Sequence, residues 1–167
     1  MPLKHSITMA QIQQNFGKFR KSYPRFVGTI GVGFFKENFR RQGFVDTSLQ
    51  KWQARRRKDA AKNRRAILVK TGRLRRSIRI TASSHQSVRI GTDVPYAKIH
   101  NEGGTINQTV KVRSHKRRTR KGSTTVKGHS RKVNTKIPKR QFAGNSAGLN
   151  KRIQRQTIQR LRNILNP

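Results

Sequence analysis

The chain has 167 residues, and its 41 Lys and Arg face only five Asp and Glu, for a formal net charge of +36. Five acids cannot neutralise this surface, and solubility requires far less charge, so we expect a polyanionic partner, either nucleic acid or a strongly acidic protein surface. The absence of cysteine excludes disulfides and thiolate metal sites. The N-terminus lacks the apolar core of a signal peptide, and no apolar run is long enough to span a bilayer. We therefore expect a soluble protein that is made in a cytosol, without membrane contact.

The composition predicts a single domain, 1–167, with a small core. Only 31% of the residues are hydrophobic and the mean hydropathy is −0.90, so basic extensions should need a partner to become ordered. The pattern along the chain indicates a helical N-terminal region, a core in two pieces and an inserted basic arm. These regions are 1–65, with a basic stretch at 51–65; 66–105 and 137–167; and 106–137.

The N-terminal region has the pattern of two helices. Ser6 or Thr8 is expected to cap the first, in which apolar residues recur every three or four positions. Pro24 is expected to open the second, because proline suits the first turn of a helix. The apolar positions are Met9, Ile12, Phe16 and Phe19 in the first helix and Ile30, Phe34, Phe35 and Phe39 in the second.

Two features of this region leave alternatives open. Gly28, Gly31 and Gly33 permit another backbone to approach closely, either in a loosely packed core helix or at a subunit interface. The segment Asp46–Trp52 indicates a turn or short helix, which brings Trp52 onto the core or, alternatively, into position to stack on a base.

The middle of the chain is expected to mix short helices and strands. A short helix is predicted at Thr71–Ser77. Alternating apolar and polar residues at Ile78–Thr81 and Val88–Ile90 predict the two strands of a hairpin. Pro95 is expected to begin another helix, and Gly103–Gly104 to end it, because glycine is favoured just past a helix C-terminus.

The segment Ile106–Ile137 predicts a β-hairpin arm with a long, basic and flexible tip. Val110 and Val112 alternate with basic residues on the outgoing leg, and Val126 and Val133 mark a weaker return leg. No aromatic residue occurs in the arm, so we expect phosphate contacts without base stacking, that is, sequence-independent binding of duplex DNA. The earlier basic stretch is either a basic helix or a loop that orders on contact. The candidate contacts to nucleic acid or an acidic partner are Lys111, Arg113, Lys116, Arg117, Arg118, Arg120, Lys121, Lys127, Arg131 and Lys132 in the arm, and Arg55, Arg56 and Arg57 before it.

The chain is expected to close with a helix at Ser146–Leu165, capped by Ser146 and packed across the sheet. Its apolar stripe has a 3.6-residue period and consists of Leu149, Ile153, Ile158, Leu161, Ile164 and Leu165. We predict an α+β fold: a small antiparallel sheet of about four strands, covered by N- and C-terminal helices, with a long basic β-hairpin arm. The residues expected to be buried include Leu74, Tyr96, Phe142, Ile153 and Leu161.

Catalysis is not expected. Five scattered acids cannot hold the metal ions of a two-metal nuclease. His115 and His129 lie in the most basic stretch, where a cation would be repelled, and no Cys completes a zinc site. No segment resembles a nucleophile elbow. We therefore expect no catalytic residue, no metal and no cofactor.

Three motifs occur in a fixed order along the chain. They are Thr71, Gly72, Leu74 and Ser77; then Gly91, Thr92, Tyr96, Ala97, His100, Gly103 and Gly104; and finally Pro138, Arg140 and Phe142. In this order and spacing they resemble the Mu-like phage virion morphogenesis, or tail completion, family. The first 65 residues match that family only in helical character and in having a Trp.

The resemblance implies a structural virion protein at the head–tail junction or upper tail, assembled in the host bacterial cytoplasm and acting in tail completion and head–tail joining. It also implies a ring, with a hexamer expected, around the DNA channel and next to neck or tail proteins. The net charge of +36 leads us to expect acidic surfaces on those neighbours. A ring needs two different surfaces on each copy, for which the glycine-containing N-terminal segment and the edge of the arm are candidates. His100 is expected at the centre of the fold, bonded to a backbone group or to Glu102, and Asp93 as a turn or N-cap acid.

Two other classes of protein fit the charge. One is a ribosomal or other RNA-packed basic protein, and the other is a DNA-condensing protein inside a capsid. RNase sensitivity of the purified particle would reveal the first, and a high copy number per virion would reveal the second.

Overall fold

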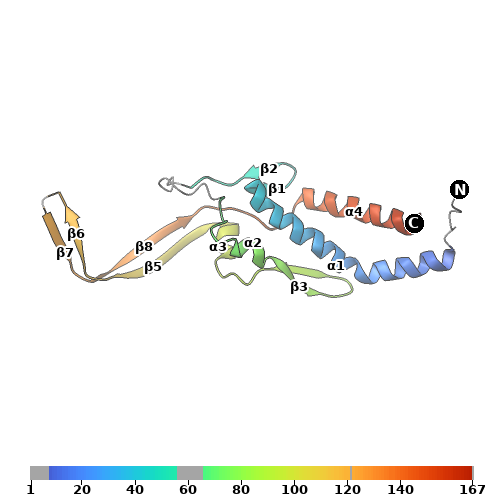
Figure 1. The fold of residues 1–167 in the computed structure, drawn as a ribbon, viewed down its shortest axis with the longest axis horizontal. Helices are drawn as coiled ribbons and strands as arrows, with labels where there is room; N and C mark the ends of the chain where they lie inside the picture. The colour runs from blue at the N-terminus through green and yellow to red at the C-terminus, as the bar shows by residue number, and fades with distance from the viewer. Residues whose placement is uncertain (1–7, 56–65, 121, 167) are drawn as a thin grey trace.

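The computed structural model describes residues 8–55, 66–120 and 122–166. The molecule is elongated: the β-arm occupies one end, the N-terminal half of one long helix and the C-terminal helix occupy the other, and the small core lies between them (Figure 1). The fold is α+β, as predicted. Within the described residues, the strands form four separate two-stranded antiparallel sheets rather than one sheet.

A single helix, α1 (Met9–Arg41), runs through the body. Thr8 caps it through a capping box, in which Thr8 Oγ1 accepts from Gln11 N at 3.3 Å and Gln11 Oε1 accepts from Thr8 N at 2.9 Å. The prediction that Pro24 opens a second helix is wrong, because α1 continues through this buried residue. An internal proline costs roughly 3 kcal/mol, so the packing of α1 on both sides of Pro24 must outweigh that cost.

A short hairpin follows α1, formed by β1 (Gly43–Val45) and β2 (Leu49–Lys51). The sequence indicated a turn or short helix at Asp46–Trp52. The structure instead places the strand β2 within this segment. Trp52 comes directly after β2 and is 8% exposed. Its backbone N–H donates to Gln42 O at 2.9 Å. The interpretation of Trp52 as a core anchor is therefore confirmed.

The glycines of α1 allow a second hairpin to approach. This hairpin, β3 (Arg79–Ser83) and β4 (Val88–Gly91), forms as predicted and packs on α1. A Cβ atom at Gly28 would lie 2.6 Å from a methyl of Val88, and one at Gly31 would lie 2.5 Å from Ile90 Cδ1. Both glycines therefore serve the core packing, and their surface is not available for a neighbouring subunit.

The core forms where α1 meets the short elements. Phe39 is 1% exposed, and its ring lies 5.5 Å from that of Trp52 and 5.2 Å from that of Phe142. The short helices α2 (Arg73–Ser77) and α3 (Ala97–Glu102) add Leu74 and Ala97. As predicted, α3 follows Pro95 and ends at Gly103.

The last helix, α4 (Ala147–Leu165), lies beside α1 (Figure 1). Ser146 caps it, as predicted, because its Oγ accepts from Leu149 N at 3.0 Å. No residue of α4 is buried, and Ile153 and Leu161 are only half-buried. The prediction of their burial is wrong because α4 rests mainly on α1 and not on a sheet. Tyr96, also predicted to be buried, is 42% exposed.

The arm is built from two successive antiparallel pairs. At its base β5 (Gly104–Val112) pairs with β8 (His129–Ile137), and at its tip β6 (His115–Thr119) pairs with β7 (Gly122–Val126). The arm therefore exists as predicted, and its tip, which was expected to be long and flexible, is a second antiparallel pair. Within the described ranges, no helix is long and apolar enough to cross a membrane.

Candidate nucleic-acid interface

The register of the arm separates its side chains onto two faces. Alternate residues of paired strands share a face, so Lys111, Lys132 and Lys136 lie on one side. The hydroxyl and amide residues Thr105, Asn107, Thr109, Ser130 and Asn134 share this side with them. All three lysines are exposed. Donors on flexible stems surrounded by small polar groups can bind phosphate oxygens without reading bases.

The opposite face of the same strands is largely apolar. It consists of Ile106, Gln108, Val110, Val112, His129, Arg131, Val133, Thr135 and Ile137, with Gly104 at its base. Ile106 is 37% exposed, and the valines are half-buried. The arm is therefore an amphipathic ribbon, and its predicted contact Arg131 lies on a different face from Lys111 and Lys132.

The tip of the arm concentrates cations without acids. Lys116, Arg117 and Arg118 are exposed and lie opposite Thr125, Thr124 and Ser123 in the register. Arg113, Arg120 and Lys127 are exposed on the connections of the same arm. Arg55, by contrast, lies on the body, where its Nη2 donates to Ala66 O at 3.1 Å. The candidate residues Arg56, Arg57 and Lys121 lie outside the described residues.

Two glycines fix the base of the arm to the body. Gly103 has φ +79°, a conformation that favours glycine. A Cβ atom there would lie 2.8 Å from the backbone N of Lys139. At Gly104, which has φ +149°, a Cβ atom would lie 2.8 Å from Ile99 Cδ1. The two legs of the arm therefore leave the body in close contact, which sets the direction of the ribbon.

The segment that leads back from the arm is held by side chains instead of a sheet. Asn101 Oδ1 accepts from the backbone N–H groups of Phe142 and Ala143 at 2.9 and 3.0 Å. Asn38, which is 1% exposed, donates to Phe142 O at 3.0 Å, and Trp52 Nε1 donates to Gln141 O at 2.6 Å. Irregular buried backbone needs such partners. The motif residue Phe142 is thus both a core side chain and a bonded backbone unit.

The motif residues Arg140 and Pro138 occupy the edge of this segment. Arg140 donates from Nε and Nη2 to Gln53 O, both at 3.2 Å. Burial, followed by the charge of Arg55, lowers the pKa of Arg140. Pro138 is half-buried. Arg140 therefore links the segment after the arm to the segment that contains Gln53, and its guanidinium is not a free phosphate ligand.

The first motif forms the turn that enters the β3–β4 hairpin. Gly72 has φ +71° and precedes α2, and Thr71 Oγ1 accepts from Arg73 N at 3.4 Å. Ser77 Oγ lies 2.5 Å from Thr92 Oγ1, which also accepts from Val94 N at 3.2 Å. The expectation that Asp93 is a turn or N-cap acid just before Val94–Pro95 is wrong, because the Val94 N–H bonds Thr92 instead. Thr92 has that role.

Asp93 and Gly91 instead belong to the outer side of the hairpin. Asp93 lies 3.5 Å from Arg79 in an exposed ion pair. A Cβ atom at Gly91 would lie 3.0 Å from Thr81 Cγ2, so a side chain there would crowd the neighbouring strand. The motif glycine keeps the two strands close.

His100 differs from the expectation. Its Nδ1 is buried and has no hydrogen-bond partner among the described residues, so the expected bond to a backbone group or to Glu102 is wrong. The ring packs edge-on to Tyr96, with centroids 5.8 Å apart. Burial, followed by the charge of Arg140, lowers the pKa of His100, which keeps its imidazole neutral at neutral pH.

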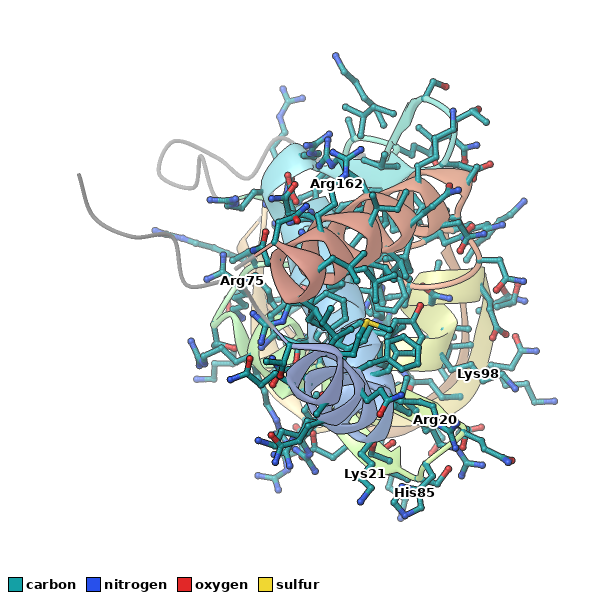
Figure 2. All side chains as sticks on the ribbon, turned by 90° about the vertical axis from the view of Figure 1, so that its right-hand side faces the viewer. Arg20, Lys21, Arg75, His85, Lys98 and Arg162 are labelled. Carbon is teal, nitrogen blue, oxygen red and sulfur yellow. The ribbon has the colours of Figure 1, made fainter. Side chains whose placement is uncertain are left out.

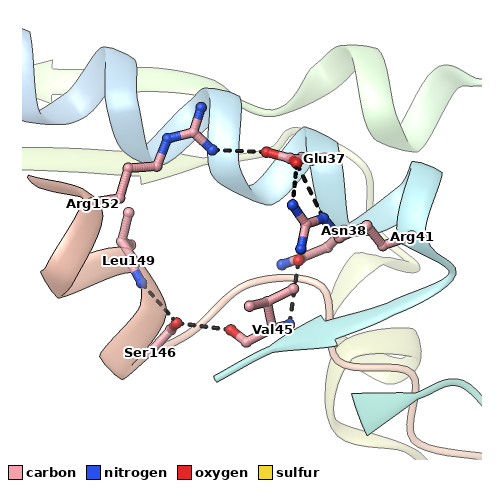
Figure 3. A network of polar contacts seen from close by, with 7 residues as sticks. All are labelled: Glu37, Asn38, Arg41, Val45, Ser146, Leu149 and Arg152. Carbon is pink, nitrogen blue, oxygen red and sulfur yellow. Dashed lines mark hydrogen bonds and ion pairs between the residues drawn. The ribbon is translucent and has the colours of Figure 1, made fainter. Parts of the chain in front are cut away.

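One carboxylate ties α1 to α4. Glu37 Oε2 lies 2.7 Å from Arg152 Nη1, and Glu37 Oε1 lies 2.7 Å from Arg41 Nη2 (Figure 3). Hydrogen bonds from Arg152 and then Arg41 lower the pKa of Glu37. In the same region, Ser146 Oγ donates to Val45 O at 2.7 Å, and Asn38 Oδ1 accepts from Val45 N at 3.3 Å.

Many other cations of the described residues lie on the surface of the body. Seen along the molecule from its helical end, basic side chains such as Arg20, Lys21, Lys98 and Arg162 project outward in several directions (Figure 2). The positive charge is therefore not confined to the arm. The described residues contain no group of three His, Asp or Glu side chains that could hold a metal ion.

The architecture is that of a small core from which a basic ribbon projects. Gly103 and Gly104 of the second motif lie at the base of that ribbon, and the first motif forms the turn that enters the β3–β4 hairpin. The chain belongs to the phage virion morphogenesis family, whose family model matches residues 35–162, more than half of its length. It is therefore a structural or assembly protein of a phage virion. The match begins within α1, so the family likeness reaches further into the N-terminal region than the motifs indicated. Comparison with curated proteins and with solved structures gave no match.

Proposed function

We propose that this protein acts in tail completion and head–tail joining, as a ring around the DNA channel at the neck or upper tail. The observation that carries the proposal is the arm: a ribbon with cations along one face and at its tip, and no acid after Glu102 in the chain. Such a ribbon suits phosphate contacts that let any sequence slide past. Membership of the family supports a role in the virion. The ring and its position at the neck or upper tail are what we propose.

Duplex binding by the tip can be tested directly. Lys116, Arg117, Arg118, Arg120 and Lys121 are replaced with Gln in the full chain, and the affinity for duplexes of unrelated sequence is measured over a range of salt concentrations. Affinity should fall equally for all sequences, and the slope of log affinity against log salt should flatten by up to about 0.9 for each phosphate that is no longer neutralised. The fold should survive because no core residue is changed.

A matched control removes the same charge from the other end of the molecule. Lys18, Lys151, Arg155, Arg160 and Arg162 are exposed residues of α1 and α4, far from the arm (Figure 1). Neutralising them should leave the slope closer to that of the wild type. Equal slopes for the two variants would show that binding follows net charge and not the arm.

The expected ring can be tested by native mass spectrometry of the protein with and without duplex DNA. A closed ring should give one discrete oligomer, with a hexamer expected. Neighbouring virion proteins with acidic surfaces are the second class of partner that we propose, because the basic side chains of the body point in more directions than one duplex can reach.

A further inference from the structure

A groove on the body gathers cations that the arm does not include. It has a volume of about 350 Å³ and lies between α1, α2 and α4. Its lining residues are Gly33, Lys36, Glu37, Arg40, Arg75, Arg76 and Arg152. Gly33 has no atom within 4 Å of the position of a Cβ, so the missing side chain leaves space in the groove.

The groove has an excess of positive charge that the described residues do not compensate. Its only carboxylate, Glu37, is already engaged by Arg152 and by Arg41. Lys36, Arg40, Arg75 and Arg76 have no carboxylate within ion-pair distance among the described residues. Lys36 and Arg75 are also half-buried, so they are less well solvated than the cations of the arm.

Placing these cations together has an energetic cost. Lys36 and Arg40 are four residues apart on α1, where like charges destabilise a helix. Arg75 and Arg76 come from a different element and add to the same repulsion. A bound anion would remove this cost, and guanidinium groups bind carboxylate and phosphate through paired hydrogen bonds.

We propose that this groove binds an acidic peptide segment of a neighbouring protein, through carboxylates inserted among Lys36, Arg40, Arg75 and Arg76. This inference deepens the proposed function, because it assigns the acidic-partner contact to the body and leaves duplex DNA to the arm. A concave site of this size fits one or two inserted side chains. The convex surface of a duplex would meet the projecting arm more easily than recessed residues such as Arg75.

The probe for the test is a fluorescent hexaglutamate peptide, with hexaglutamine as its uncharged counterpart. Binding is measured by anisotropy to the full chain and to two variants with equal charge. One carries Lys36→Gln, Arg75→Gln and Arg76→Gln in the groove. The other carries Arg117→Gln, Arg118→Gln and Arg120→Gln at the tip of the arm. Duplex DNA is titrated in parallel with each protein.

The groove variant should bind hexaglutamate roughly tenfold more weakly than the tip variant, because cations from three elements line the groove around one hollow. Equal weakening in the two variants would overturn the proposal. A loss of duplex binding alone in the groove variant would also overturn it, by making the groove a nucleic-acid site. Failure of the proposal that the arm binds duplex DNA would give a different result. In that case the tip variant would keep the DNA affinity and the salt slope of the wild type.

A second pair of variants keeps every cation in place. Gly33→Glu puts a carboxylate into the groove from within the chain, and Gly33→Gln fills the same space without charge. The Glu variant should bind hexaglutamate more weakly than the Gln variant and should be the more stable of the two in thermal unfolding. Identical peptide affinities for the two variants would contradict the assignment of the groove.

Discussion

Buried amide side chains hold the irregular segment that closes the core. Asn38 is the clearest case, because both of its polar atoms bond to backbone: Nδ2 to Phe142 O, and Oδ1 to Val45 N. With an exposed fraction of 1%, it has no access to water as a substitute. Asn38 therefore links β1 to the segment before α4, which Asn101 and Trp52 also hold.

Asn38→Ala should lower the free energy of unfolding by roughly 2–5 kcal/mol, since the buried Phe142 O and the partly buried Val45 N–H would lose the bonds to Asn38. Asn163→Ala is the matched control, because Asn163 is exposed on α4 and its side chain accepts from the Gln159 side chain. Urea denaturation followed by the fluorescence of Trp52 measures both. Equal midpoints for the two variants would show that Asn38 is not an anchor.

Glu37 makes a pH-dependent contribution to stability. Its pKa is lowered in the folded state by Arg152 and Arg41, so the unfolded chain takes up a proton first, at an ordinary pKa of about 4.3. The stabilisation is complete above that value and is lost as the pH falls through the lower folded pKa. The wild type should be more stable than Glu37→Gln at pH 7, and the difference should shrink in acid. A difference that stays constant down to the acid limit would exclude this linkage.

The contact of α1 with the β3–β4 hairpin depends on Gly28 and Gly31, whereas Gly33 on the same helix does not touch the hairpin. Gly28→Ala should destabilise the protein by roughly 1–3 kcal/mol, because the added methyl would lie 2.6 Å from a methyl of Val88. Gly33→Ala should have the opposite sign and stabilise the helix by roughly 0.5–1 kcal/mol, because nothing lies near that position. Thermal unfolding of the two variants compares them in the same helix. Destabilisation by both variants would mean that the loss of stability does not come from the contact with the hairpin.

The strength of packing differs between the core and α4. Leu74 is 3% exposed, and Leu74→Ala should cost roughly 2–5 kcal/mol. Leu161 is only half-buried, so Leu161→Ala should cost less, about 1 kcal/mol. Denaturant midpoints of the two variants give the comparison. A larger destabilisation by Leu161→Ala would indicate that α4 is covered by another subunit under the conditions of the measurement.

Elements with a strong local signal could be predicted from the sequence. Thr8, Ser146 and Gly103 mark helix ends because their backbone and capping chemistry is local. Pro24 and Tyr96 could not be placed correctly, since the packing of distant elements decides both. The same is true of the candidate site: the arm cations are consecutive in sequence, but the groove combines three elements that come together only in the fold.

At the scale of the whole molecule, the charge exceeds what one duplex can balance. A hexamer would carry +216, six times +36. A stretch of duplex about 40 Å long carries only around 24 phosphate charges. Screening over a Debye length of roughly 8 Å does not remove repulsion between subunits in contact. The assembled protein should therefore bury much of its positive charge against acidic protein surfaces or further nucleic acid.

The copy number of this protein in purified virions tests the central claim most directly. Quantitative mass spectrometry against a capsid protein of known count would supply it. A neck ring predicts a small fixed number, on the order of six copies per particle. Hundreds of copies would contradict the ring and favour a DNA-condensing protein inside the capsid, and absence from the mature particle would contradict a place in the neck.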